Sequence, residues 1–154
     1  MGIDERGSEN SFSPGTVIEV EIETPCLSFV KRRSDGHIDF ISPIPSPFDY
    51  GFIPGTIAGD GDPQDAIVFT RRRLRRFDRL SARVVGCVRV IDAGACDDKL
   101  IAVEEEKFQD RKPELGASAR IRLVVFFKFY GIFKKILNRS RRKSGETKVI
   151  SVDV

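Results

Sequence analysis

Arg79–Ile91 reads RLSARVVGCVRVI, and this stretch predicts the longest strand of the chain. Apolar residues recur at alternate positions along it and share one face of an extended strand. They are Leu80, Ala82, Val84, Val88 and Val90. Gly86 falls within this series and predicts a β-bulge, because a glycine inside a strand often marks one.

More strands are predicted on both sides of this stretch. Thr16–Thr24 alternates isoleucine and valine with glutamate, which is typical of a half-buried strand. Ser28–Arg33 and His37–Ile41 flank the turn sequence SDG and predict a hairpin. Three prolines make Ser42–Phe48 a stiff loop. Shorter strands are expected at Ala66–Thr70, Lys99–Val103 and Thr147–Val152.

The last third of the chain changes its apolar period and predicts one long helix, or two, from Pro113 to Asn138. Pro113 suits the first helical turn. The apolar residues that fit this helical pattern are Leu115, Ile121, Val124, Val125, Phe129, Ile132, Phe133, Ile136 and Leu137. The expected fold is α+β and mainly β: a curved, mainly antiparallel sheet or barrel with a C-terminal helix packed against it.

Length and composition predict one globular domain. The chain has 154 residues, of which 40% are hydrophobic and 32% charged, and its net charge is only +3. Residues 1–15 are expected to form a flexible tail, and residues 16–154 a single domain. The single histidine, His37, excludes a histidine-rich zinc site and is expected on the surface.

The cysteine pattern and the hydropathy predict a cytoplasmic location. The three cysteines are odd in number and widely spaced, which favours reduced thiols over a disulfide framework. No apolar run approaches the length of a membrane span, and the N-terminus lacks the apolar core of a signal peptide. We therefore expect no membrane partner.

Two short aspartate clusters carry the chemistry. Asp60–Asp65 reads DGDPQD and Asp92–Asp97 reads DAGACD, each beside a predicted strand. Either cluster alone could be a surface turn, because aspartate, glycine and proline favour turns. If the two clusters meet, the crowded carboxylates need cations among them. Oxygen ligands favour Mg²⁺ or Mn²⁺, and Mg²⁺ usually accompanies a phosphorylated substrate.

Four sequence blocks in consistent order resemble the soluble family I inorganic pyrophosphatases. Asp60–Val68, DGDPQDAIV, matches the signature in which D-G-D-P-x-D precedes an apolar strand. Tyr50–Phe52 lies ahead of it at the family's spacing, and Phe126–Tyr130 resembles the helix ending F-F-x-x-Y. Asp92, Asp97 and Lys99 recur at the family's internal spacing. The resemblance runs from about Val17 to Tyr130.

The resemblance implies a Mg²⁺-dependent enzyme, with Mn²⁺ as an alternative ion, that hydrolyses pyrophosphate to two phosphates with several ions in each active site. The implied metal ligands are Asp60, Asp65, Asp92 and Asp97. Asp62 would be the catalytic base that helps to deprotonate the attacking water. The implied substrate-binding residues are Lys31, Tyr50, Lys99 and Tyr130. One of Glu19, Glu21 and Glu23 would support the site. The resemblance also implies a small OB-like β-barrel with a flanking helix, and a homo-oligomer.

The chain departs from the family in the residues that hold phosphate. The family has an arginine between the hairpin and Tyr50, but Asp39–Phe48 contains none. The family also has a lysine directly after the helix tyrosine, where this chain has Gly131. The family's hairpin Lys-x-Glu pattern appears here as FVKRR. Four residues are candidates to supply the missing charge: Arg32, Arg33, Lys134 and Lys135.

Two basic stretches leave other functions open. The positive charge of Arg71–Arg76 and of Arg139–Lys143 suits an anionic surface such as RNA, which is one interpretation of each stretch. We favour a solvated loop for the first and a cationic helix terminus for the second, because aromatic residues are not interleaved for base stacking. Nucleic acid is therefore not expected as a partner. The main alternative to an enzyme is a non-catalytic paralogue that binds metal, phosphate or a protein.

Overall fold

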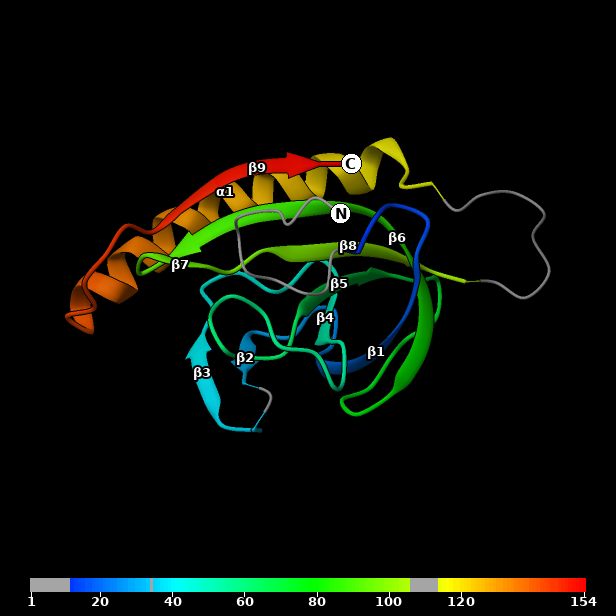
Figure 1. Cartoon of the computed structure of the whole chain (residues 1–154), viewed down its shortest axis with the longest axis horizontal. Coiled ribbons are helices and arrows are strands. Elements are labelled where there is room, and N and C mark those ends of the chain that lie inside the picture. Colours follow the sequence, from blue (N-terminus) through cyan, green and yellow to red (C-terminus); the bar gives the residue numbers. More distant parts are fainter. Residues whose placement is uncertain (1–11, 34, 106–113) are drawn as a thin grey trace, which may run out of the picture.

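A computed structural model describes residues 12–33, 35–105 and 114–154. Its main feature is a closed ring of hydrogen-bonded strands (Figure 1). In spatial order these are β1 (Val17–Thr24), β4 (Asp49–Phe52), β5 (Asp65–Phe69), β8 (Lys99–Glu104) and β6 (Arg79–Asp92). β6 pairs with β1 and so closes the ring. The pairings are antiparallel except for β5 with β8, which run parallel. The predicted closed and mainly antiparallel arrangement is confirmed.

The remaining elements extend this ring. β7 (Ala95–Cys96) and β9 (Lys148–Asp153) pair with β6, and β2 (Val30–Arg32) with β3 (Ile38–Ile41) forms the predicted hairpin as a separate sheet. The helix α1 (Ala117–Ser140) lies along β6 and β9 (Figure 1). It is one helix, and it begins at Ala117, because Gly116 is its N-cap and residues 114–116 are not helical. The predicted start at Pro113 is therefore wrong, and Pro113 itself lies outside the described residues, as does most of the predicted N-terminal tail.

β6 organises the sheet because it pairs with four other strands, β1, β7, β8 and β9. The pairing of β6 with β8 shifts register between Val84 and Gly86, so the predicted bulge is confirmed. A Cβ atom at Gly86 would lie 2.0 Å from the carbonyl oxygen of Asp153. Glycine is therefore required there, because β9 approaches the backbone of β6 too closely for any side chain.

The core has two parts, one inside the ring and one under α1. Alternate residues of a strand face opposite sides, and β5 shows this plainly. Ala66 and Val68 belong to the cluster inside the ring, whereas Ile67 belongs to the cluster under the helix. Both faces of β5 are therefore buried, which explains the unbroken apolar run Ala66–Phe69 after Asp65.

The buried face of α1 differs from the face that the sequence suggested. The residues that α1 buries are Ala119, Leu123, Phe127, Tyr130, Lys134 and Asn138. Most of the apolar residues that fitted the helical pattern are exposed: Ile121, Val124, Val125, Phe129, Ile132 and Ile136. The helix is apolar on both sides, so apolar periodicity alone did not identify its inner face. Within the described ranges, no helix is both long enough and apolar enough to span a bilayer.

Candidate active site

The two aspartate clusters meet because of the parallel pairing of β5 with β8. Asp65 begins β5, Lys99 begins β8, and these two residues are partners in the register. The cluster that precedes each strand therefore arrives at the same edge of the ring. A cavity of about 380 Å³ opens there, and its lining includes Asp39 of β3 and all five aspartates predicted for the site. These five are Asp60, Asp62, Asp65, Asp92 and Asp97.

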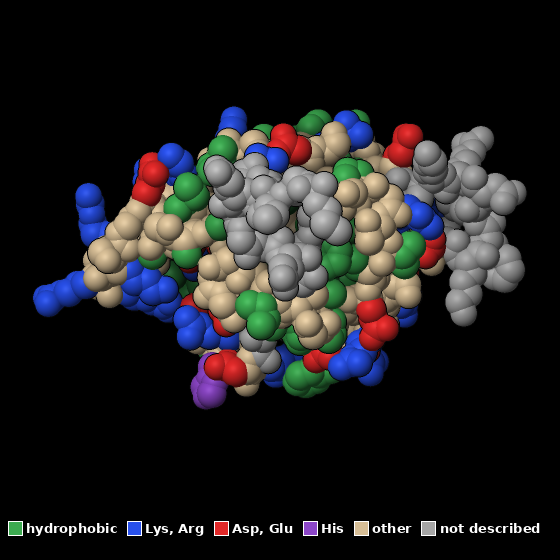
Figure 2. All heavy atoms as spheres, viewed as in Figure 1, with side chains coloured by type: hydrophobic (Ala, Val, Ile, Leu, Met, Phe, Trp, Pro, Cys, Tyr) green, Lys and Arg blue, Asp and Glu red, His purple; other side chains and the backbone are tan. Residues whose placement is uncertain are grey.

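The same cavity is lined by cationic side chains. These are Lys31, Arg32 and Arg33 from the hairpin region, together with Lys134 of α1 and Lys143 beyond its end. Tyr130 also lines it. Lys135, the fourth candidate for the missing charge, instead lines a groove between α1 and β9. Lys and Arg side chains gather at the end of the molecule where α1 ends, at the left of Figure 2, and the exposed residues that follow α1 are among them.

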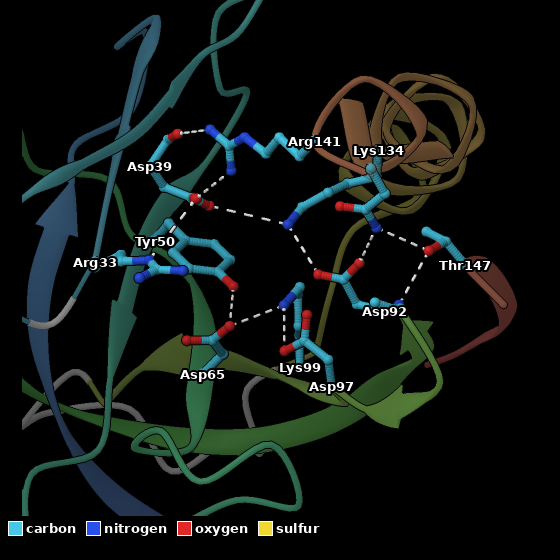
Figure 3. Close-up of polar contacts among 12 residues, drawn as sticks. Arg33, Asp39, Tyr50, Asp65, Asp92, Asp97, Lys99, Lys134, Arg141 and Thr147 are labelled. Atoms are coloured by element: carbon cyan, nitrogen blue, oxygen red, sulfur yellow. Dashed lines mark hydrogen bonds and ion pairs between the residues drawn. The ribbon is translucent and has the colours of Figure 1, made fainter. Parts of the chain in front are cut away.

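Lys99 lies behind the cavity and holds the two clusters together (Figure 3). Its side chain is 1% exposed, and its Nζ donates to Asp65 Oδ2 at 2.8 Å and to Asp97 Oδ1 at 2.9 Å. Burial disfavours the ammonium, but the two carboxylates keep the pKa of Lys99 well above its usual value. Lys99 is not part of the cavity lining, so its predicted contact with phosphate stays a prediction.

Tyr50 supports Asp65 from β4, because its hydroxyl donates to Asp65 Oδ2. Lys31 Nζ lies 3.5 Å from the centroid of the Tyr50 ring, a cation–π contact. Burial lowers the pKa of Lys31 to about 8. Burial also opposes ionisation of Asp65, but the charges of Lys99 and Lys31 outweigh it and lower the pKa of Asp65. Asp65 is thus held as a carboxylate.

Glu23 is the glutamate of β1 that faces the site. It lines the cavity and is 7% exposed, whereas Glu19 and Glu21 pair with Arg79. Its Oε1 is buried without a hydrogen-bond partner among the described residues. Burial raises the pKa of Glu23 to about 7, and the charge of Asp65 adds to this effect.

The carboxylates around Asp60 fit a divalent cation. Burial raises the pKa of Asp60, and the nearby charges of Asp97, Asp62 and Asp65 raise it further. Crowding of this kind is relieved by a hard cation with oxygen ligands. No three acidic, cysteine or histidine side chains of the described part already form a compact ligand group. The donor set fits a metal, while its present geometry is fixed by lysine contacts.

Asp92 has a different environment, which the sequence reasoning missed (Figure 3). Lys134 Nζ donates to its Oδ2 at 2.9 Å, and Asn138 Nδ2 donates to its Oδ1. Although burial opposes ionisation, the contact with Lys134 lowers the pKa of Asp92. The signal was present in the sequence: Lys134 and Asn138 follow Tyr130 at intervals of one helical turn, so all three share a face.

Asp39 of β3 joins the hairpin to α1 (Figure 3). Its carboxylate lies 3.1 Å from Arg141, 3.8 Å from Arg33 and 3.9 Å from Lys134. Arg141 also donates to the Asp39 carbonyl oxygen. No local pattern predicts this role for Asp39, because Lys134 and Arg141 lie far from it along the chain.

Comparisons with known proteins agree with this arrangement. The family model described as inorganic pyrophosphatase matches residues 12–152. The inorganic pyrophosphatase of Aquifex pyrophilus is 34% identical over 134 residues, which cover 77% of this chain and 74% of that protein. The chain superposes on the crystal structure of inorganic pyrophosphatase from Thermus thermophilus with a TM-score of 0.71 and 29% sequence identity. The superposition covers 93% of this chain and 87% of the Thermus thermophilus chain.

Some alignments with relatives are partial. The inorganic pyrophosphatase of Gluconobacter oxydans is 38% identical over 97 residues, which cover 58% of this chain but only 56% of that protein. The family model nevertheless spans nearly all of the described residues, including both aspartate clusters. The chain therefore belongs to the inorganic pyrophosphatase family.

Proposed function

We propose that this chain hydrolyses inorganic pyrophosphate to two phosphates with the help of divalent metal ions, Mg²⁺ first among them. The observation that carries the proposal is the single cavity in which the five aspartates of the two clusters lie beside a set of lysines and arginines. Acidic residues suit the cations, and basic residues suit the phosphate groups. Family membership supports the same reaction.

The roles follow from the position of each side chain. Asp60, Asp65 and Asp97 would hold divalent ions, which when bound lower the pKa of water and neutralise charge on the phosphates. Asp62 is exposed and lines the cavity, and in this proposal its carboxylate would accept a proton from the attacking water. Asp92, whose oxygens both accept hydrogen bonds, is a weaker metal ligand than the resemblance implied.

The cationic side chains would hold the phosphates. Lys31, Arg32 and Arg33 line the cavity from the hairpin side, and Lys143 lines it from beyond α1. The hydroxyl of Tyr130 is available as a donor, and burial raises its pKa to about 12, so it stays protonated. Arg32, Arg33 and Lys143 would supply the charge of the arginine and lysine that the family pattern has and this chain lacks.

The test is phosphate release from pyrophosphate, measured with Mg²⁺ and then with EDTA. We expect release in Mg²⁺ only, and a loss of roughly 10²- to 10⁴-fold in Asp62→Asn if Asp62 is the general base. Asp153→Asn is the matched control, because Asp153 is an exposed aspartate that does not line the cavity. Absence of release in every divalent metal would contradict the proposal.

A second candidate is a non-catalytic paralogue that binds metal or phosphate. The observation in its favour is the altered phosphate side of the cavity, where Gly131 replaces a lysine and the loop at Asp39–Phe48 lacks an arginine. In that case both wild type and Asp62→Asn would bind pyrophosphate, and neither would turn it over. Calorimetric titration beside the release assay separates the two candidates.

We also propose a homo-oligomer in the cytoplasm. The exposed apolar side of α1 supports an assembly, since monomers rarely leave such a surface uncovered. The three cysteines are free, which agrees with a reducing compartment. Light scattering coupled to size exclusion measures the assembly, and a monomer at micromolar concentration would contradict it.

A further inference from the structure

Lys134 is a buried lysine in the centre of the cavity wall. It is 6% exposed, and it sits on α1 one turn after Tyr130. Its Nζ lies 2.9 Å from Asp92 Oδ2 and 3.9 Å from Asp39 Oδ2 (Figure 3). We propose that Lys134 is a resident counter-ion that takes the place of a metal ion on Asp92, so that divalent cations are bound by Asp60, Asp65 and Asp97 without it.

Both oxygens of Asp92 already have donors. Lys134 binds one, and the side-chain amide of Asn138 binds the other. Each oxygen keeps a second lone pair, but a metal ligated by it at about 2.1 Å would share that oxygen with one of these donors. At Oδ2, that ion would also lie within about 5 Å of the Lys134 ammonium, where like charges repel strongly in a partly buried site.

The donors on Asp92 are themselves fixed. Asn138 is buried, and its Nδ2 donates a second hydrogen bond to Thr147 Oγ1 at 2.8 Å. The same oxygen accepts the backbone N–H of Ala93 at 3.0 Å, next to Asp92 in the chain. The Asp92 carboxylate is thus held by two residues of α1, and Thr147, which precedes β9, fixes Asn138 and the neighbouring backbone of Ala93.

The other side of Lys134 is held by Asp39. This carboxylate is paired in turn with Arg141 and Arg33, which fixes the hairpin against the helix. Lys134 therefore lies between two carboxylates, and it has little freedom to leave Asp92 when a metal arrives. A lysine that only covered the cavity would not need such partners.

Lys99 shows the contrasting case. Its ammonium donates to one carboxylate oxygen of Asp65 and to one of Asp97. Asp65 Oδ1 and Asp97 Oδ2 accept no hydrogen bond from the described residues, so each remains available to a cation. The chain thus has one lysine that leaves its carboxylates able to bind metal and another that occupies its carboxylate.

The inference rests on the proposed metal-dependent function only in that the chain must bind divalent ions. The experiment counts Mn²⁺ bound at saturation by electron paramagnetic resonance, without pyrophosphate. We expect Lys134→Met to bind one ion more than wild type, because Asp92 is released. Lys135→Met, the neighbouring exposed lysine outside the cavity, should keep the wild-type count.

Asp92 provides the second variant. Asp92→Asn alone should leave the count unchanged, and Asp92→Asn added to Lys134→Met should remove the extra ion. Fewer bound Mn²⁺ ions in Asp92→Asn, or an unchanged number in Lys134→Met, would overturn the inference but not the proposed function. Failure of wild type to bind any Mn²⁺ overturns the proposed function and the inference with it.

The wild-type protein supplies a measurement that does not depend on folding of a variant. The ammonium group of a buried, hydrogen-bonded lysine exchanges slowly enough to be followed by ¹H–¹⁵N correlation spectra. Titration with Mg²⁺ should leave the Lys134 signal, assigned by its absence in Lys134→Arg, in place at saturation. Loss of that signal to solvent exchange as Mg²⁺ binds would show that the ion displaces Lys134 from Asp92, and would overturn the inference.

Discussion

Lys99 lies opposite Asp65 in the parallel register of β8 and β5, and its ammonium donates to the Asp65 carboxylate at 2.8 Å. The same ammonium reaches Asp97 two residues before it in the chain. One buried cation therefore sets the positions of a carboxylate from each cluster. The geometry of the cavity depends on this contact before any ligand binds.

Lys99→Met should destabilise the fold by about 3–5 kcal/mol, because it leaves two carboxylates facing each other without their shared cation. Urea unfolding in EDTA measures the change. Lys148→Met is the control: Lys148 pairs with Glu146 on the surface, and its loss should cost less than about 1 kcal/mol. Equal effects of the two substitutions would show that Lys99 is not a structural cation.

Glu23 should make the metal-free protein less stable as the pH rises. Its ordinary pKa is 4.5, and in the folded chain its pKa is about 7. The folded state therefore holds a proton that the unfolded state has released between these values, and this contribution is full below pH 4.5 and lost as the pH passes 7.

Glu23→Gln should flatten that part of the profile, measured as the free energy of unfolding at pH 5 and pH 7.5 in EDTA. Glu146→Gln, an exposed glutamate, is the matched control and should keep the wild-type slope. A Glu23→Gln profile that parallels the wild-type profile would contradict the raised pKa of Glu23.

Leu123→Ala should cost about 2–5 kcal/mol, since Leu123 is fully buried under α1. Val125→Ala on the opposite side should change the stability of the monomer by less than about 0.5 kcal/mol. Thermal and urea unfolding compare the pair. The reverse order would mean that the helix packs through its other face.

Gly86→Ala should destabilise the pairing of β6 with β9 by about 1–3 kcal/mol, because the new methyl group overlaps the Asp153 carbonyl oxygen. Hydrogen exchange of the β9 amides should accelerate more than that of the β1 amides. Ser81→Ala, on the exposed side of β6, is the control and should leave the exchange of the β9 amides unchanged. Gly55→Ala is not a suitable control, because the positive φ of Gly55 would add backbone strain. Unchanged exchange in β9 would contradict the close approach.

Most strands could be predicted because alternation and turn residues are local signals. Val17–Thr24, Arg79–Asp92 and the hairpin all lie where the pattern placed them. The parallel direction of β5 and β8 was not predictable, because alternation is the same for either direction. The inner face of α1 was also missed, because polar Lys134 and Asn138 stand on it while isoleucines stand outside.

The aspartates of the site were recognisable by residue type and spacing, and the structure places all five around one cavity. Their partners were not recognisable. Asn138 meets Asp92 across 46 residues, and Arg141 meets Asp39 across 102. Such contacts depend on how the helix docks against the ring, and no local pattern in the sequence records that docking.

The parallel register of β5 and β8 also limits how this chain is able to evolve. Insertions in the exposed loop at 71–73, between β5 and β6, change only surface length. A single residue inserted inside β5 would move every later side chain of the strand to the opposite face of the sheet, because strand side chains alternate. Relatives should therefore differ in loop length freely, while the spacing from Asp65 to Phe69 stays constant.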